Sequence, residues 1–203
     1  MPLKKTSGNM YDWVTHTHSH LGGECPHRCS YCYTQQNKFG VAPRYQGKIR
    51  LIEKELLVKY DEKTLKKDGG IYPGIIFIEH MNDLFADEVD YKIIGRVMEH
   101  CRKHSDNTYV FQTKNPLRAF EFISIFPPKY IIGTTIESNR SYNISRAPFP
   151  DARFQGIKNF SMCGVDTFIT IEPVMDFDVD TFAEKIIQAK PSFINIGGVK
   201  VAI

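Results

Sequence analysis

Short apolar runs alternate with stretches of helical periodicity along most of the chain. The apolar and β-branched runs are typical of strands, because buried helices are usually longer than these runs. They predict six strands, at residues 11–17, 75–78, 109–113, 130–136, 167–174 and 193–196. The segments between them are long enough to hold helices, so the pattern predicts strands that alternate with helices.

Several segments between these runs carry helix signals of their own. Asn115-Pro116 is a capping residue followed by proline at the first helical position. The other predicted helices and their boundary signals are 51–67 ended by Asp68-Gly69-Gly70, 91–104 capped by Asp90, about 150–163, and a last helix with the capping box Thr181-Phe-Ala-Glu184 ended by Lys190-Pro191.

Strand and helix alternation indicates an α/β fold with parallel strands and right-handed crossovers. Six units are too few to close an eight-fold barrel, so we expect a curved, open (β/α)6 partial barrel. Residues 1–203 should form one domain, because a chain of 203 residues can bury a single substantial core. In barrels of this kind, the chemistry is found at the carboxyl ends of the strands.

Composition narrows the class of protein further. The apolar fraction of 42% and the charged fraction of 24% are ordinary for a globular protein. No apolar run approaches the length of a membrane span, and the first residues do not resemble a signal peptide. An odd number of cysteines fits a reducing compartment, so we expect a cytoplasmic protein. The net charge of +3 permits a nucleic-acid partner without requiring one.

The strongest chemical signal is the segment Cys25-Pro-His-Arg-Cys29-Ser-Tyr31-Cys32, which directly follows the first predicted strand. Three thiolates this close can all reach one metal centre. A zinc site would need a fourth ligand, for which the sequence offers His27, His20 or His18. A [4Fe–4S] cluster held by three cysteines would keep one iron open. Ligand count and spacing favour iron–sulfur, because no second Cys or His pair follows.

The other cysteines lie apart from this segment. Cys101 falls on the apolar stripe of the predicted helix 91–104 and is expected to be a core thiol. Cys163 is isolated at the end of another predicted helix. Neither is expected to bind the metal.

The C-x3-C-x2-C spacing with Tyr31 before the third cysteine resembles the signature of the radical S-adenosylmethionine (SAM) superfamily. The continuation Cys32-Tyr33-Thr34-Gln35 resembles the spore photoproduct lyase branch and related small phage-encoded proteins. The resemblance implies a partial barrel whose [4Fe–4S] cluster chelates SAM at its open iron and cleaves it to a 5′-deoxyadenosyl radical. It also implies an electron donor such as flavodoxin or ferredoxin.

Polar residues follow the predicted strands on the face that should carry this chemistry. We expect Asn82 and Asp83 to meet the ammonium group of SAM and Lys114 to meet its carboxylate. These positions resemble the polar pair and the lysine that line SAM in the lyase branch. Ser138 resembles the serine that lines SAM in that branch. At Gly197-Gly198 the backbone could come close to adenine or substrate, or simply turn the chain. The remaining expected SAM contacts are Tyr31, Thr113, Glu137, Ser138, Asn139 and Glu172. The alternative is helix capping by Asp83 and Asn115 and a surface ion pair for Lys114.

The chain also departs from the lyase pattern. Met81 occupies the place of a hydrogen-donating cysteine, so photoproduct repair itself is not expected; Cys163 and Tyr33 are possible substitutes. We also expect no C-terminal extension to close the site, and an open site suits a large substrate such as a nucleic-acid base or a polypeptide. The scattered cations leave DNA or RNA as the leading choice, and a solvated charged face explains them equally well. They include Lys38, Arg44, Lys48, Arg50, Arg140 and Arg146.

Two hypotheses therefore follow from the sequence. The first is a radical SAM enzyme that abstracts hydrogen from a large substrate, with a nucleic-acid base as the leading choice. The second is a non-enzymatic, zinc-stabilised nucleic-acid-binding module, which chelators would unfold. Iron or zinc content of the native protein distinguishes them.

Overall fold

The computed structural model describes residues 3–7, 10–34, 42–67 and 69–197. Its centre is a seven-stranded sheet in the order β1-β2-β5-β6-β7-β8-β9. Strands β2 to β9 of this sheet are parallel, and β1 adds an antiparallel edge. Their bounds are β1 Lys4–Lys5, β2 His16–His18, β5 Ile75–Ile78, β6 Thr108–Gln112, β7 Tyr130–Thr135, β8 Thr167–Ile171 and β9 Phe193–Ile196.

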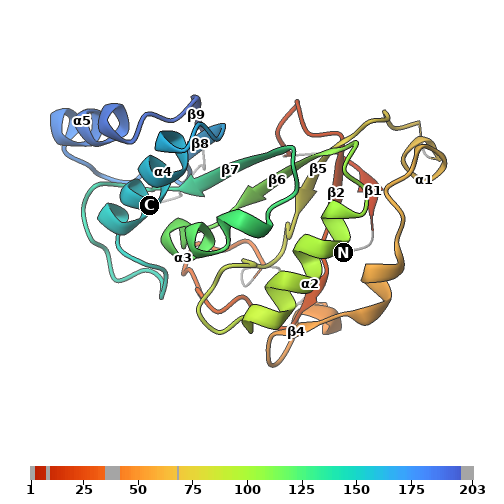
Figure 1. Cartoon of the computed structure of the whole chain (residues 1–203). Helices are drawn as coiled ribbons and strands as arrows, with labels where there is room; N and C mark the ends of the chain where they lie inside the picture. Colours follow the sequence, from red (N-terminus) through yellow and green to blue (C-terminus); the bar gives the residue numbers. More distant parts are fainter. Residues whose placement is uncertain (1–2, 8–9, 35–41, 68, 198–203) are drawn as a thin grey trace.

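Helices connect the parallel strands, and Figure 1 shows α2, α3 and α4 lying over one face of the sheet. A small antiparallel pair, β3 (Leu21–Gly22) and β4 (Arg50–Leu51), belongs to the first connection. The helices are α1 Glu62–Lys66, α2 Tyr91–Arg102, α3 Pro116–Glu121, α4 Pro150–Met162 and α5 Val179–Ala189, with 3₁₀ turns η1 Pro43–Tyr45, η2 Glu53–Leu57 and η3 Ile123–Ile125. Within the described ranges, none of these helices has the length and apolarity needed to cross a membrane.

The predicted fold class is confirmed, because the six parallel strands form an open α/β sheet. Local signals set several boundaries correctly. Asp90 caps α2 by accepting a hydrogen bond from Lys92 N at 2.8 Å. Asn115 is the N-cap of α3, with Pro116 at its first turn. Lys190 ends α5 in the left-handed conformation, with φ of 51°.

Four predicted elements were wrong in detail. The strand predicted at 167–174 ends at Ile171, as β8. The helix over 51–67 is in fact β4, η2 and α1, because Val58 and Asp61 are extended and a new cap forms at Asp61, whose carboxylate accepts from Thr64 N at 2.8 Å. The capping box at Thr181 does not start α5, which begins at Val179. Of the strand predicted at 11–17, only residues from His16 onward join the sheet.

The residues before His16 instead pack on the inner face of the sheet. Tyr11 and Trp13 stack with ring centroids 5.3 Å apart, and Trp13 meets the edges of Phe168 and Phe193. Gly133 leaves room for this layer, because a Cβ there would lie 2.2 Å from the Phe168 ring. The N-terminal segment therefore fills the concave side, while the larger core lies between the other face and the helices.

Candidate metal and cofactor site

The three clustered cysteines lie in the connection between β3 and η1, as expected for the first strand-to-helix loop. Cys29 is buried, whereas Cys25 and Cys32 are partly buried. Turn hydrogen bonds join Arg28 N to Cys25 O at 3.3 Å and Cys32 N to Cys29 O at 3.0 Å. The backbone of Arg28 adopts the left-handed conformation, with φ of 45°. We refer to residues 24–33 as the cysteine loop.

The surroundings of the Cys25 thiol disfavour its ionised form. Burial raises the pKa of Cys25 to about 12, and Asp83, Cys29 and Cys32 add to the rise. In the protein alone the Cys25 thiol is therefore protonated at neutral pH. A bound metal cation reverses this balance, because it holds thiols in the deprotonated form.

The histidines that could complete a zinc site are bonded elsewhere. His27 Nε2 lies 2.8 Å from Asp83 Oδ2, His18 Nε2 lies 2.8 Å from Glu55 Oε2, and His20 Nε2 lies 2.8 Å from His100 Nδ1. Across the described part of the chain, no three His, Cys, Asp or Glu side chains form a group that could hold a metal ion.

A zinc ion takes four donors around one point, so a zinc site here would need a fourth ligand beside the three cysteines. An iron–sulfur cluster takes its thiolates on separate iron atoms, so its ligands are spread more widely. The three cysteines of this partly buried loop, with His27 held by Asp83, match in number the thiolates of a [4Fe–4S] cluster that keeps one iron open, and the identity of the metal stays a prediction.

Asp83 connects the cysteine loop to the ends of two strands. Besides its contact with His27, it accepts hydrogen bonds from Thr113 Oγ1 and Lys114 N, both at 2.7 Å, and from Phe85 N at 3.0 Å. Burial alone would raise the pKa of Asp83, but His27 and these donors hold it below its ordinary value. The carboxylate is therefore ionised and already engaged, which makes it a positioning residue for both segments.

Asn82 differs from its neighbour because part of its side chain is unused. Its Nδ2 donates to Gly23 O at 3.4 Å, while Oδ1 is buried and has no partner among the described residues. A buried, unpaired acceptor costs about 1–3 kcal/mol. An acceptor held in this way beside the cysteine loop fits the predicted contact with the SAM ammonium group.

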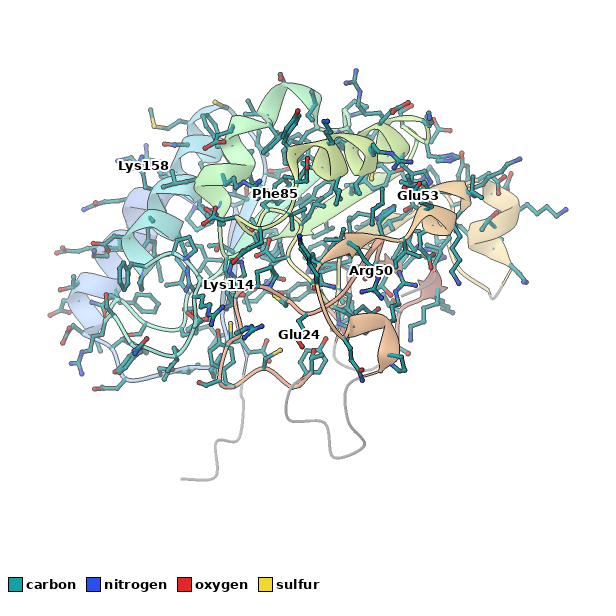
Figure 2. The ribbon with its side chains drawn as sticks, turned by 90° about the horizontal axis from the view of Figure 1, so that it is seen from below. Glu24, Arg50, Glu53, Phe85, Lys114 and Lys158 are labelled. Atoms are coloured by element: carbon teal, nitrogen blue, oxygen red, sulfur yellow. The ribbon has the colours of Figure 1, made fainter. Side chains whose placement is uncertain are left out.

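Lys114 belongs to a buried ionic cluster with Tyr31, Glu137 and Arg153. Its Nζ donates to Tyr31 Oη at 2.7 Å and pairs with Glu137, which also accepts from Tyr31. Arg153 Nη1 lies 2.7 Å from the other Glu137 oxygen. Figure 2 labels Lys114, which reaches this cluster from the end of β6.

The charges of this cluster do not cancel. Burial would raise the pKa of Glu137, but Lys114 and Arg153 hold it below its ordinary value. Burial, Glu137 and the Cys29 thiol raise the pKa of Tyr31, so the phenol stays protonated and donates. Two cations face one carboxylate, and one of the three Lys114 N–H groups has no acceptor among the residues that the structure describes. The cluster is therefore suited to an anionic group such as a carboxylate.

The other predicted SAM contacts are engaged differently. Ser138 Oγ donates to Asp176 O at 2.7 Å, and Asn139 Oδ1 accepts from Asp178 N at 3.0 Å. Both side chains therefore tie the β7–α4 loop to the β8–α5 loop, and their contact with ribose stays a prediction. Glu172 is exposed, and a Cβ on Gly197 would lie 2.7 Å from its carboxyl carbon. Gly198 lies outside the described residues.

The two possible hydrogen donors lie in different places. Tyr33 Oη donates to Met81 Sδ at 3.3 Å, so it belongs to the candidate site. Cys163 is exposed at the end of α4, directly before β8 begins. A helix that connects parallel strands ends at the opposite edge of the sheet, so the suggestion of Cys163 was wrong.

Sequence reasoning missed Arg153, which lies within α4 and neutralises Glu137 from there. Nothing local marks an arginine in a helix as a partner of a residue at a strand end. It also assigned His27 only to zinc, whereas the structure places it on Asp83.

Comparison with known proteins gives a family and a fold. The family model described as "Protein of unknown function (DUF5131)" matches residues 10–177. No curated protein matches the sequence. Similar solved structures include a spore photoproduct lyase variant with bound AdoMet and dinucleoside spore photoproduct. Its TM-score is 0.65 at 15% identity, and the match covers 92% of this chain and 55% of the lyase.

A second lyase structure, complexed with dinucleoside spore photoproduct, has a TM-score of 0.66 at 14% identity, with 96% of this chain and 58% of the lyase covered. This chain thus spans little more than half the length of the lyases. At this identity the likeness shows the fold alone, an open α/β partial barrel.

Proposed function

The chain belongs to the DUF5131 family of proteins of unknown function, and we propose that it is a radical SAM enzyme with a [4Fe–4S] cluster on Cys25, Cys29 and Cys32. The observation that carries the proposal is the direct bonding of the cysteine loop to the strand ends, through Tyr31 to Lys114 and His27 to Asp83. When bound, the cluster supplies the electron that cleaves SAM to a 5′-deoxyadenosyl radical.

The protein side chains bind and orient SAM in this proposal. Asn82 Oδ1 accepts from its ammonium group, because this oxygen is otherwise unpaired. The unused N–H of Lys114 donates to its carboxylate, and Glu137 and Arg153 hold the lysine in place. Asp83 keeps the cysteine loop and the β6 end in register. An electron donor such as flavodoxin or ferredoxin would reduce the cluster.

The proposed substrate is a large molecule, with a nucleic-acid base as the first choice. The lyase structures of similar fold hold a dinucleoside, which supports a substrate of this class. Met81 in contact with Tyr33 gives the site no cysteine thiol as hydrogen donor at this position. The net reaction is therefore proposed to be a base modification other than photoproduct repair.

The first test is SAM cleavage by the anaerobically purified, reconstituted protein. With dithionite and SAM we expect 5′-deoxyadenosine to accumulate, together with about four irons per chain. Chromatography and iron analysis give the two readouts. Stoichiometric zinc in native material, with no deoxyadenosine, would favour the zinc-stabilised nucleic-acid-binding module instead.

Replacement of Lys114 by alanine should weaken SAM binding while iron content is kept. A charge-assisted hydrogen bond contributes roughly 1.5–3 kcal/mol, so SAM affinity should fall about ten- to a hundred-fold. Titration of the reduced cluster with SAM by electron paramagnetic resonance measures this. Lys129→Ala is the control, because Lys129 is exposed at the start of β7, on the opposite edge of the sheet. An unchanged curve for Lys114→Ala would disprove the carboxylate contact.

A further inference from the structure

A pocket of about 460 Å³ lies beside the β7–α4 loop, next to the ionic cluster of Lys114. Glu137 lines both the pocket and the ionic cluster, so the two are contiguous. The volume is within the range of sites that bind small molecules or single nucleotides. The residues that line it include Arg140, Tyr142, Arg146, Phe149 and Arg153.

The arginines of the pocket differ in their pairing. Arg153 is paired with Glu137, and Arg140 is held by Asp176 and Asp178. Arg146 is exposed and has no acidic partner among the described residues. Its guanidinium is therefore the charge in this pocket that is available to an incoming anion. The planar, forked donor set of arginine suits phosphate in particular.

An exposed aromatic side chain lies in the same pocket. Phe149 is 69% exposed, although it precedes the buried Pro150 at the start of α4. Tyr142 lines the pocket too, with its hydroxyl donating to Asp176 O at 3.0 Å. Arginine combined with exposed aromatic rings is the pattern by which proteins bind single-stranded nucleic acids. An acidic peptide would use the arginine but would gain little from Phe149.

The pocket is held at a fixed position relative to the cysteine loop. Ser30 N donates to Ile144 O at 2.8 Å, and Arg146 N donates to His27 O at 2.7 Å. The backbone of Arg146 is thus hydrogen-bonded to that of His27, which lies between Cys25 and Cys29. A ligand on Arg146 would therefore lie beside the proposed cluster, where a substrate must lie.

We propose that this pocket binds one nucleotide of a single-stranded nucleic acid, with Arg146 on a phosphate and Phe149 stacked on a base. The assignment rests on the proposed function in that it names the substrate class of the same site. The bound nucleotide would flank the base that reacts, because the pocket lies outside the Asn82 and Lys114 contacts. Double-stranded substrate would have to open locally to place a base on Phe149.

The test is fluorescence anisotropy with short labelled single-stranded oligonucleotides and the reconstituted protein, without SAM or reductant. Arg146→Ala should weaken binding, and the slope of log affinity against log salt should fall by about 0.7, the value for one phosphate contact. Phe149→Ala should weaken binding about fivefold or more, as expected when a stacked base is lost. Arg146→Lys should restore part of the affinity.

The control is Arg102→Ala, an exposed arginine at the end of α2, which should leave binding unchanged. Unchanged binding in either Arg146→Ala or Phe149→Ala overturns the proposal. Equal binding of an abasic oligonucleotide, or competition by polyglutamate as strong as by oligonucleotide, overturns the base-stacking part and indicates a site for acidic peptides. Because SAM is left out, these results are independent of deoxyadenosine formation, so the two proposals can fail separately.

Discussion

Alanine at Cys25, Cys29 or Cys32 is expected to reduce cluster iron to near zero and to abolish SAM cleavage. Three protein thiolates are needed to hold a cluster whose fourth iron stays open, so none of them is dispensable. All three lie in one loop that is bonded to Asp83, Lys114 and residues 144–146, and the loop should keep its fold without metal. Iron analysis and the visible spectrum of anaerobically reconstituted variants measure the loss.

Cys101 and Cys163 provide matched controls for this prediction. Cys101 is fully buried on α2, where burial raises its pKa well above the ordinary value, and Cys163 is exposed at the end of α4. Alanine at either position should leave iron content intact. A cluster that survives in Cys29→Ala, or is lost in Cys163→Ala, would contradict the ligand assignment.

Glu137→Ala is expected to destabilise the protein by about 3–5 kcal/mol, the cost of removing one partner from a buried ion pair. Glu137 is the shared carboxylate of Lys114 and Arg153, whose side chains are only 15% and 4% exposed. Without it, two buried cations face each other and Tyr31 loses its acceptor. Urea unfolding followed by circular dichroism measures the change in the free energy of unfolding.

Two further variants separate charge from packing in this prediction. Glu137→Gln keeps the shape of the side chain but removes its charge, so it should destabilise nearly as much as alanine. Asp178→Ala removes an exposed carboxylate, 57% exposed, from its pair with Arg140 and should cost less than about 1 kcal/mol. Equal effects of Glu137→Ala and Asp178→Ala would show that the Glu137 cluster is not a buried electrostatic unit.

The polar side chains of the candidate site fall into two groups: those free to bind SAM and those that hold the surrounding loops in place. Asp83 and Ser138 have their oxygen atoms engaged within the protein, so their substitution should disturb loop geometry first. Within the described ranges, Asn82 Oδ1 and one Lys114 N–H have no partner, so these two groups are the stronger candidates for SAM. This division could not be made from residue type, because both sets consist of polar residues at strand ends.

The sequence by itself determined the order of strands and helices, the cysteine loop and the edge of the sheet that carries the polar residues. These features are local: a strand such as 75–78 or a ligand spacing such as Cys29 to Cys32 depends on residues that are near in the chain. The tertiary structure decided which polar groups remain unpaired. His27 meets Asp83 across 56 positions, Lys114 meets Tyr31 across 83, and Tyr11 meets Thr170 across 159. Such contacts depend on the register and curvature of the whole sheet, which no local pattern specifies. For that reason, the ionic cluster of Lys114 and the packing of the N-terminal segment on the concave face could be seen only in the folded chain.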